Sequence, residues 1–337
     1  MMRSFAALAA LLVSAVLPSE QPPAPSEAPA RPVVLLVHGR GQVGDSALLH
    51  RDATRALQEG AQSVSGSALL RDGDVRLVWY ADVLSDGSAS SAACAAPSPR
   101  PVPATEAGAL DMFSLVAGAF LEFAGDDIDG TPLSSVRSLI GDVRFLTNPV
   151  ARCVAEARIG NAIAAAAREG RPVILVGHSL GGLMAWGHLQ SRENRENRES
   201  HAGRARALPA VHRFVTLGSP VGSPEVRGFV FGSRGALGLP AGVGSWINVV
   251  DADDPFAAPL LPGMEADTTT TLTANPGLRD AMTQSRRSDA HELRGYLRDP
   301  AATHAILGAW CGTMREDRES TAGCATLALT SPMAVGR

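Results

Sequence analysis

A serine flanked by glycines is the residue with the clearest chemical potential in this sequence. Residues 177–181 read Gly-His-Ser-Leu-Gly, which matches G-x-S-x-G with Ser179 at its centre. An apolar, β-branched run at 173–176 precedes the motif, and apolar residues return at helical spacing from Leu183 onward. A buried strand that passes directly into a helix leaves Ser179 on a sharp turn, where its Oγ can attack a substrate. We therefore interpret Ser179 as a nucleophile rather than as part of an ordinary glycine-rich turn.

The glycines of the motif have a steric explanation. Side chains at Gly177 and Gly181 would clash where the strand and the helix approach each other.

A serine nucleophile also requires a base and an acid that orients the base. The candidate acids are Asp251, Asp253 and Asp254, which follow an apolar strand. We assign the acid to Asp254, because it lies further into the loop and Pro255 restricts its backbone. Asp251 and Asp253 stay open as alternatives, since aspartates also cap turns that end at a proline.

The predicted base is His291, which lies just before an expected C-terminal helix. His304 is the only later histidine and therefore the only rival in that part of the chain. The order Ser179, Asp254, His291 along the chain is the order typical of this kind of serine turn.

A developing oxyanion would need two backbone N–H donors. The sequence predicts one from Leu180 and the other from Arg40 or Gly41, in the loop that follows an apolar run at 33–37. His38 and His178 are interpreted as buried groups that support the site rather than as the base.

The rest of the chain predicts an α/β fold, with a mostly parallel central sheet and helices on both faces. Strands are expected at 33–37, 75–83, 173–176, 214–217 and 246–251, with 246–251 the last clear one. Asp45 or Ser46 is expected to cap a helix that runs through Leu57, and an alanine-rich helix is expected at 151–168. The charged run 191–200 is interpreted as a solvated loop or a helix extension.

Together these features resemble the α/β-hydrolase superfamily, and within it bacterial secreted lipases and esterases. The resemblance covers roughly residues 32–310 and depends on five local features: His38-Gly39, Gly-His-Ser-Leu-Gly-Gly, Thr216-Leu-Gly-Ser-Pro220, Asp254-Pro255 and Asp289-Ala-His291. It implies a catalytic triad of Ser179, Asp254 and His291, with Leu180 and Arg40 as the oxyanion donors. It also implies cleavage of small-molecule or lipid carboxylic esters through an acyl-enzyme. The same triad also supports thioester, amide or peptide hydrolysis.

The chain divides into a leader, a linker, a domain and a tail. Residues 1–18 have the short apolar core of a signal peptide, and 19–31 form a proline-rich linker, so we expect export to the periplasm or the medium. The domain at 32–310 carries an insertion at 85–148, which departs from the family pattern and which we interpret as a cap. Within it, residues 110–123 predict an apolar helix that either lines the cap or is an ordinary core helix. Residues 311–337 form the tail.

The chain has four cysteines, and an even number is compatible with two disulfides in an oxidising compartment. Cys311 and Cys324 lie close together in a polar segment and are the first predicted pair. Cys94 and Cys153 are then left as the second pair, which would tie the insertion to the helix before the serine strand.

Several other function classes find little support. A net charge of −4 gives no electrostatic case for nucleic-acid binding, and no later apolar stretch is long enough to span a membrane. No spacing predicts a metal site. Gly39, Gly41 and Gly44 match the dinucleotide fingerprint G-x-G-x-x-G, but no acidic residue ends a second strand about 20 residues later. A dinucleotide-binding oxidoreductase is thus a distant alternative, and we expect no cofactor.

Overall fold

The computed structural model describes most of the predicted domain in nine pieces. The described residues are 31–39, 45–85, 94, 148–200, 211–260, 270–272, 275–283, 290–314 and 321–330. The predicted leader, nearly all of the linker, the 110–123 segment and almost all of the expected cap at 85–148 lie outside them.

Strands and helices alternate along the described chain, as the apolar pattern predicts. The strands are β1 (Val33–Val37), β2 (Val75–Val78), β3 (Val173–His178), β4 (Arg213–Leu217), β5 (Trp246–Asp251), β6 (Thr270–Leu272) and β7 (Asn275–Thr283). The helices are α1 (Ser46–Ser65), α2 (Ala81–Ser85), α5 (Pro149–Arg168), α6 (Leu180–Ser200), α7 (Pro224–Phe231), α8 (Leu293–Arg298), α9 (Pro300–Thr313) and α10 (Thr321–Thr330), with the 3-10 turn η2 (Pro220–Gly222).

The strands form a single sheet in the order β2-β1-β3-β4-β5-β7-β6. All neighbouring pairs from β2 to β7 are parallel, and β6 alone runs antiparallel to its neighbour. The fold is therefore α/β with a mostly parallel sheet, as predicted. The strand that leads to Ser179, β3, is an interior strand that lies between β1 and β4. Ser179 therefore lies at the carboxyl end of a strand in the middle of the sheet.

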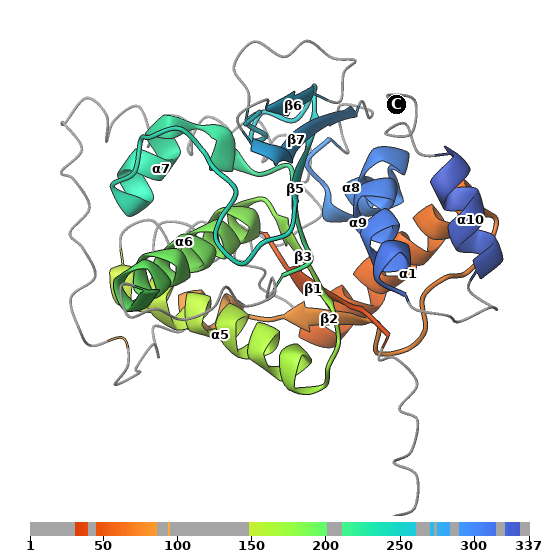
Figure 1. Ribbon diagram of the computed structural model, residues 1–337, viewed down its shortest axis with the longest axis horizontal. Helices are drawn as coiled ribbons and strands as arrows, with labels where there is room; N and C mark the ends of the chain where they lie inside the picture. The colour runs from red at the N-terminus through yellow and green to blue at the C-terminus, as the bar shows by residue number, and fades with distance from the viewer. Residues whose placement is uncertain are drawn as a thin grey trace, which may run out of the picture.

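Both faces of the sheet are buried under helices (Figure 1). In β1, Val33, Leu35 and Val37 belong to an apolar cluster with α5, α6 and α7. The intervening residues of β1, Val34 and Leu36, pack instead in a second cluster with α1, α8 and α9. Strands buried on both faces read as continuous apolar runs, which is why β1 and β3 could be found from sequence.

The first described helix begins and ends where its sequence requires. Asp45 caps α1, because its side chain accepts a hydrogen bond from the backbone N–H of Ala47 at 2.8 Å. Gly66 follows the helix with φ of 68°, a left-handed conformation that favours glycine. The helix predicted at 151–168 is α5, and the charged run 191–200 continues α6 as a helix extension.

Two parts of the predicted sheet were wrong. The strand expected at 75–83 ends at Val78, since the chain turns at Tyr80, whose backbone carbonyl accepts from the N–H of Val83 in the first turn of α2. The strand at 246–251 is also not the last one, because β7 pairs in parallel with it. The β7 sequence contains proline, glycine and charged residues, yet Asp280 is fully buried where it accepts from Asn248 and from the N–H of Leu260.

Both predicted cysteine pairs lie at disulfide distance. Cys94 pairs with Cys153 of α5, and Cys311 of α9 pairs with Cys324 of α10, with Cα atoms 5.7 and 5.5 Å apart. The second bridge fastens α10 to the domain, where α10 also contacts α1. Among the helices within the described ranges, none is long and apolar enough to cross a membrane.

Candidate active site

The backbone at Ser179 has an unusual conformation. β3 ends at His178 and α6 begins at Leu180, so Ser179 is the single residue between strand and helix. Its φ is 54°, and of the described residues it is the only non-glycine with a positive φ. Such a conformation costs about 1–3 kcal/mol and persists only where neighbouring structure enforces it. The N–H of Ser179 donates to the carbonyl of Leu217 at 2.9 Å, which ties the turn to the end of β4.

Glycines allow the chain to pack closely around this turn. A Cβ on Gly177 would lie 2.5 Å from the Cα of Gly182, and one on Gly181 would lie 2.1 Å from the carbonyl oxygen of His38. The predicted clashes at 177 and 181 are thus confirmed. Gly39 is equally constrained, since a Cβ there would come within 2.9 Å of the Ser179 Cβ. The loop that follows β1 therefore starts in direct contact with the serine.

Ser179, His291 and Asp254 form a continuous chain of hydrogen bonds. The Ser179 Oγ lies 3.0 Å from the His291 Nε2, and the His291 Nδ1 lies 2.9 Å from each oxygen of Asp254. A carboxylate only accepts, so Nδ1 carries the proton and Nε2 is the nitrogen that accepts from the serine hydroxyl. All three residues are buried, with exposed fractions of 3, 7 and 5 %.

Of the three candidate acids, only Asp254 reaches His291. It lies just beyond β5, where its N–H donates to the carbonyl of Asp251 and its Oδ1 accepts from the N–H of Phe256 at 2.9 Å. Asp251 instead accepts from the N–H of Asp253 at 2.9 Å, and Asp253 is exposed. The turn thus uses Asp251 to cap itself and directs Asp254 toward the imidazole.

The rival histidine, His304, is engaged elsewhere. Its Nδ1 lies 2.6 Å from the carbonyl oxygen of Pro300, one turn earlier in α9.

His178 supports the predicted base, His291, through a contact with its backbone. Its Nε2 donates to the carbonyl of His291 at 2.9 Å, and the two rings are 5.0 Å apart. Burial lowers the pKa of His178 well below its usual value, and the neighbouring His291 lowers it further. His178 is therefore neutral and serves as a hydrogen-bond donor that holds the segment carrying His291.

His38 supports the loop after β1 rather than the serine. Its Nδ1 donates to the carbonyl of Gly39 at 2.9 Å, and its Nε2 accepts from the N–H of Tyr80 at 3.3 Å. The Tyr80 hydroxyl lies 2.7 Å from both the His38 and Gly39 carbonyl oxygens, and its ring stacks on His38 at 4.0 Å. These contacts fix the backbone immediately before residue 40.

Of the two expected oxyanion donors, the structure describes one. Leu180 is the first residue of α6, so its N–H has no acceptor within the helix and points out of the helix start. Arg40 and Gly41 lie outside the described residues.

Sequence reasoning missed Tyr296, which lies on α8. Its hydroxyl donates to Asp254 Oδ2 at 2.7 Å and accepts from the N–H of Asp251 at 3.1 Å. Gly218, with φ of 55°, makes room for this contact, because a Cβ there would lie 2.5 Å from Asp254 Oδ2. The only sequence signal is a tyrosine five residues after the predicted base, which by itself predicts no particular contact.

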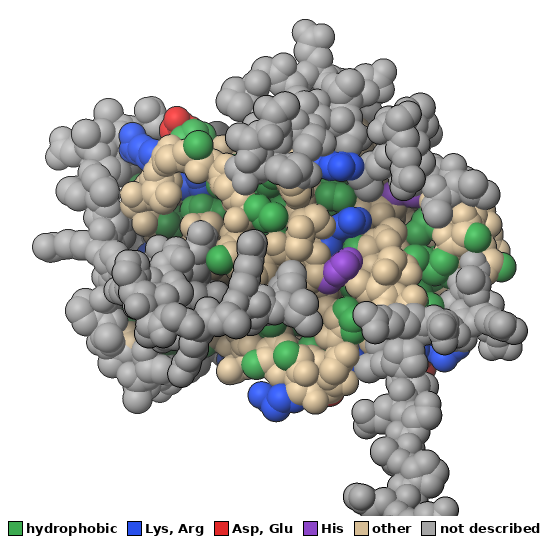
Figure 2. All heavy atoms as spheres, viewed as in Figure 1, with side chains coloured by type: hydrophobic (Ala, Val, Ile, Leu, Met, Phe, Trp, Pro, Cys, Tyr) green, Lys and Arg blue, Asp and Glu red, His purple; other side chains and the backbone are tan. Residues whose placement is uncertain are grey.

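Two other kinds of site were considered from the sequence, one for a metal ion and one for a dinucleotide. The described residues contain no group of three or more His, Cys, Asp or Glu side chains placed to hold a metal ion. Of the dinucleotide-like glycines only Gly39 is described, and it packs against Ser179. On the face shown in Figure 2, the coloured arginine side chains are spread out rather than gathered into one patch.

Comparisons with protein-family models, with curated protein sequences and with solved structures found no significant match to this chain.

Proposed function

We propose that this protein is a serine hydrolase of the α/β-hydrolase type that cleaves carboxylic esters through an acyl-enzyme on Ser179. The observation that carries the proposal is the buried chain from Asp254 through His291 to Ser179, with distances of 2.9 and 3.0 Å. The positive φ of Ser179 adds to it, since backbone strain concentrates at functional turns.

The reaction would proceed in two steps, acylation of Ser179 and hydrolysis of the acyl-enzyme. Ser179 Oγ attacks the ester carbonyl while its proton passes to His291 Nε2, and Asp254 stabilises the imidazolium that forms. The tetrahedral intermediate then collapses, the ester C–O bond breaks, and His291 returns the proton to the leaving alcohol. A water molecule repeats the sequence on the acyl-enzyme, which releases the acid and restores Ser179.

The oxyanion of each intermediate would be bound by the backbone N–H groups of Leu180 and Arg40. For Leu180 the support is its position at the start of α6. For Arg40 it is the preceding residue, Gly39, which lies against the serine. Phe256 covers the imidazole of His291 at a ring distance of 4.5 Å and supplies an apolar wall beside the reacting atoms. Such a wall favours apolar esters, including lipid esters, as substrates.

We also propose that the protein acts outside the cytoplasm, in the periplasm or the medium. Two cysteine pairs at disulfide distance support this, because disulfides persist in oxidising compartments.

The test combines covalent labelling with a substrate panel. A fluorophosphonate probe should label Ser179, and Ser179→Ala should abolish labelling and lower kcat by about 10⁴- to 10⁶-fold. The matched control is Ser219→Ala, which removes another fully buried serine hydroxyl at the end of the neighbouring strand. The control should still be labelled.

The panel contains aryl esters of rising chain length, thioesters and peptide amides. The proposal expects esters to be cleaved fastest. Labelling of another serine, or full activity in Ser179→Ala, would refute the nucleophile. Faster cleavage of thioesters or amides would keep the triad and replace the substrate class.

A further inference from the structure

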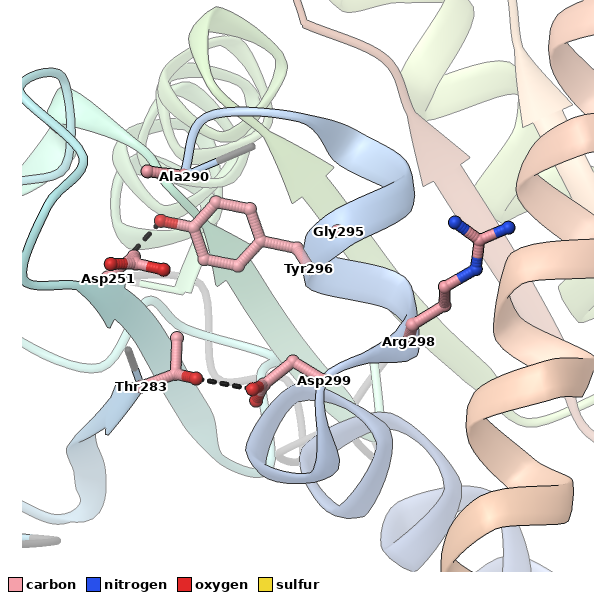
Figure 3. Close-up of a pocket in the computed structure, with 7 residues that line it drawn as sticks. All are labelled: Asp251, Thr283, Ala290, Gly295, Tyr296, Arg298 and Asp299. Carbon is pink, nitrogen blue, oxygen red and sulfur yellow. Dashed lines mark hydrogen bonds between the residues drawn. The ribbon is translucent and has the colours of Figure 1, made fainter. Parts of the chain in front are cut away.

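The Asp254 carboxylate has a further partner, Tyr296. As Figure 3 shows, the tyrosine side chain extends from α8 toward Asp251 at the end of β5. Its hydroxyl makes two contacts there: it donates to Asp254 Oδ2 at 2.7 Å and accepts from the Asp251 N–H at 3.1 Å. One phenol thus links the helix after the base to the turn that carries the acid.

The Asp254 carboxylate is held symmetrically as a result. Oδ1 accepts from the N–H of Phe256 at 2.9 Å, and Oδ2 accepts from the Tyr296 hydroxyl at 2.7 Å. Both oxygens lie 2.9 Å from His291 Nδ1. A carboxylate that is held on both oxygens cannot rotate away from the imidazole without losing a hydrogen bond.

Tyr296 also lines a pocket. The pocket has a volume of about 180 Å³ and is lined by Asp251, Thr283, Ala290, Gly295, Tyr296, Arg298 and Asp299 (Figure 3). Tyr296 itself is 3 % exposed. Its burial and the adjacent Asp254 raise the pKa of the phenol far above its usual value, so it remains a neutral donor.

We propose that Tyr296 is a positioning residue for the Ser179–His291–Asp254 chain, and that its hydrogen bond sets the pH at which His291 begins to act as a base. This inference rests on the proposed function. The Tyr296 hydroxyl draws negative charge toward Oδ2 and away from His291. Without it, more of the carboxylate charge faces the imidazole, which then holds its proton to a higher pH.

The other groups near the imidazole would stay in place when the hydroxyl is removed. His178 from β3 faces it at a ring distance of 5.0 Å, and Phe256 faces it from the turn after β5. Asp251 of β5 contacts the phenol through its N–H. Exposed Glu292 and Arg294 pair with each other at 3.5 Å on the segment that carries His291. A change of pH dependence in Tyr296→Phe would therefore report on the lost hydroxyl.

The first test is the pH profile of kcat/KM for Tyr296→Phe with a short aryl ester. The acid-side midpoint should move upward by roughly one pH unit, the scale of one hydrogen bond to a charged group. Tyr80→Phe is the matched control, since Tyr80 is the only other tyrosine and its buried hydroxyl contacts backbone carbonyls instead of the triad. The control should change the rate without moving the midpoint.

The second test needs no turnover. In Ser179→Ala protein, the His291 ring is titrated by NMR with and without Tyr296→Phe, and its midpoint should rise by a similar amount. If no ester is cleaved but this midpoint moves, the inference holds and the proposed function fails. If esters are cleaved and neither midpoint moves in folded Tyr296→Phe, the inference is overturned.

A third measurement applies if Tyr296→Phe does not fold. Tyr80→Phe protein grown with 3-fluorotyrosine carries the label only at Tyr296. The fluorinated phenol is more acidic and donates more strongly, so the acid-side midpoint should move downward. An unchanged midpoint in that protein would overturn the inference.

Discussion

Replacing Asp254 with asparagine tests the geometry of the site most directly. Every contact to this carboxylate comes from a donor: His291 Nδ1 at 2.9 Å to both oxygens, the Phe256 N–H at 2.9 Å and the Tyr296 hydroxyl at 2.7 Å. In Asp254→Asn one oxygen becomes an NH₂ group, which also donates. Because His291 Nδ1 lies 2.9 Å from both carboxylate oxygens, this NH₂ group opposes the Nδ1–H whichever way the amide is turned, and only one acceptor remains beside it.

The imidazole can relieve this clash by moving its proton to Nε2, where it then faces Ser179 as a donor. His291 in that tautomer cannot accept the serine proton. We therefore expect kcat to fall by about 10⁴-fold, equivalent to roughly 5.5 kcal/mol in activation free energy, with little change in KM.

The assay is steady-state hydrolysis of a short aryl ester, with folding checked by circular dichroism. Asp251→Asn is the matched control. The carboxylate of Asp251 accepts from the Asp253 N–H, a bond that an asparagine carbonyl can also accept. The control should keep kcat within about threefold. A large loss in Asp251→Asn together with near-normal activity in Asp254→Asn would refute this assignment of the acid.

Three further predictions concern stability. Burial depresses the pKa of His178 in the folded state, so the unfolded chain binds an extra proton below about pH 6.5 and the free energy of unfolding should fall as pH decreases. Urea melts of His178→Gln should show a shallower dependence of this free energy on pH, and an unchanged dependence would contradict the prediction. Cys324→Ser opens a loop of 13 positions and should lower the free energy of unfolding by about 3 kcal/mol in the chain-entropy model. Melts under non-reducing conditions would check this, and Cys311→Ser should lose the same amount because it breaks the same bridge. Gly181→Ala places a Cβ 2.1 Å from the carbonyl oxygen of His38, just after β1, and should lower Tm strongly. Gly312→Ala is the control, since nothing lies within 4 Å of its added Cβ, and equal melting temperatures of the two variants would show that the turn at Gly181 can relax.

Sequence reasoning predicted those parts of the fold that depend on local pattern. The runs 33–37 and 173–176 are apolar at every position because both faces of their strands are buried, and that pattern can be read directly. β7 could not be predicted in this way. Pro276 and Asp280 argue against a strand locally, and Asp280 becomes acceptable only because Asn248 and the N–H of Leu260 meet it across the fold.

The residues of the candidate site also differ in whether the local sequence identifies them. Ser179, Asp254 and His291 were found because each has a local signature: a glycine-flanked turn, an Asp-Pro dipeptide and a histidine before a helix. The structure brings these three side chains together. Tyr296 has no such signature, since its contact depends on how α8 lies beside the turn after β5. The expected cap and Arg40 lie outside the described residues, so those two expectations stay predictions.

The two cysteine pairs have a consequence for how the chain withstands proteases. As disulfides they close rings spanning 59 and 13 positions of the sequence. A single cut of the backbone between residues 95 and 152, or between 312 and 323, would release no fragment, because both sides of the break stay covalently joined. A nicked molecule would keep its full mass on a non-reducing gel and separate into two pieces only after reduction. One cut anywhere between residues 95 and 152, in the segment that joins β2 to β3, would therefore leave both pieces attached to each other.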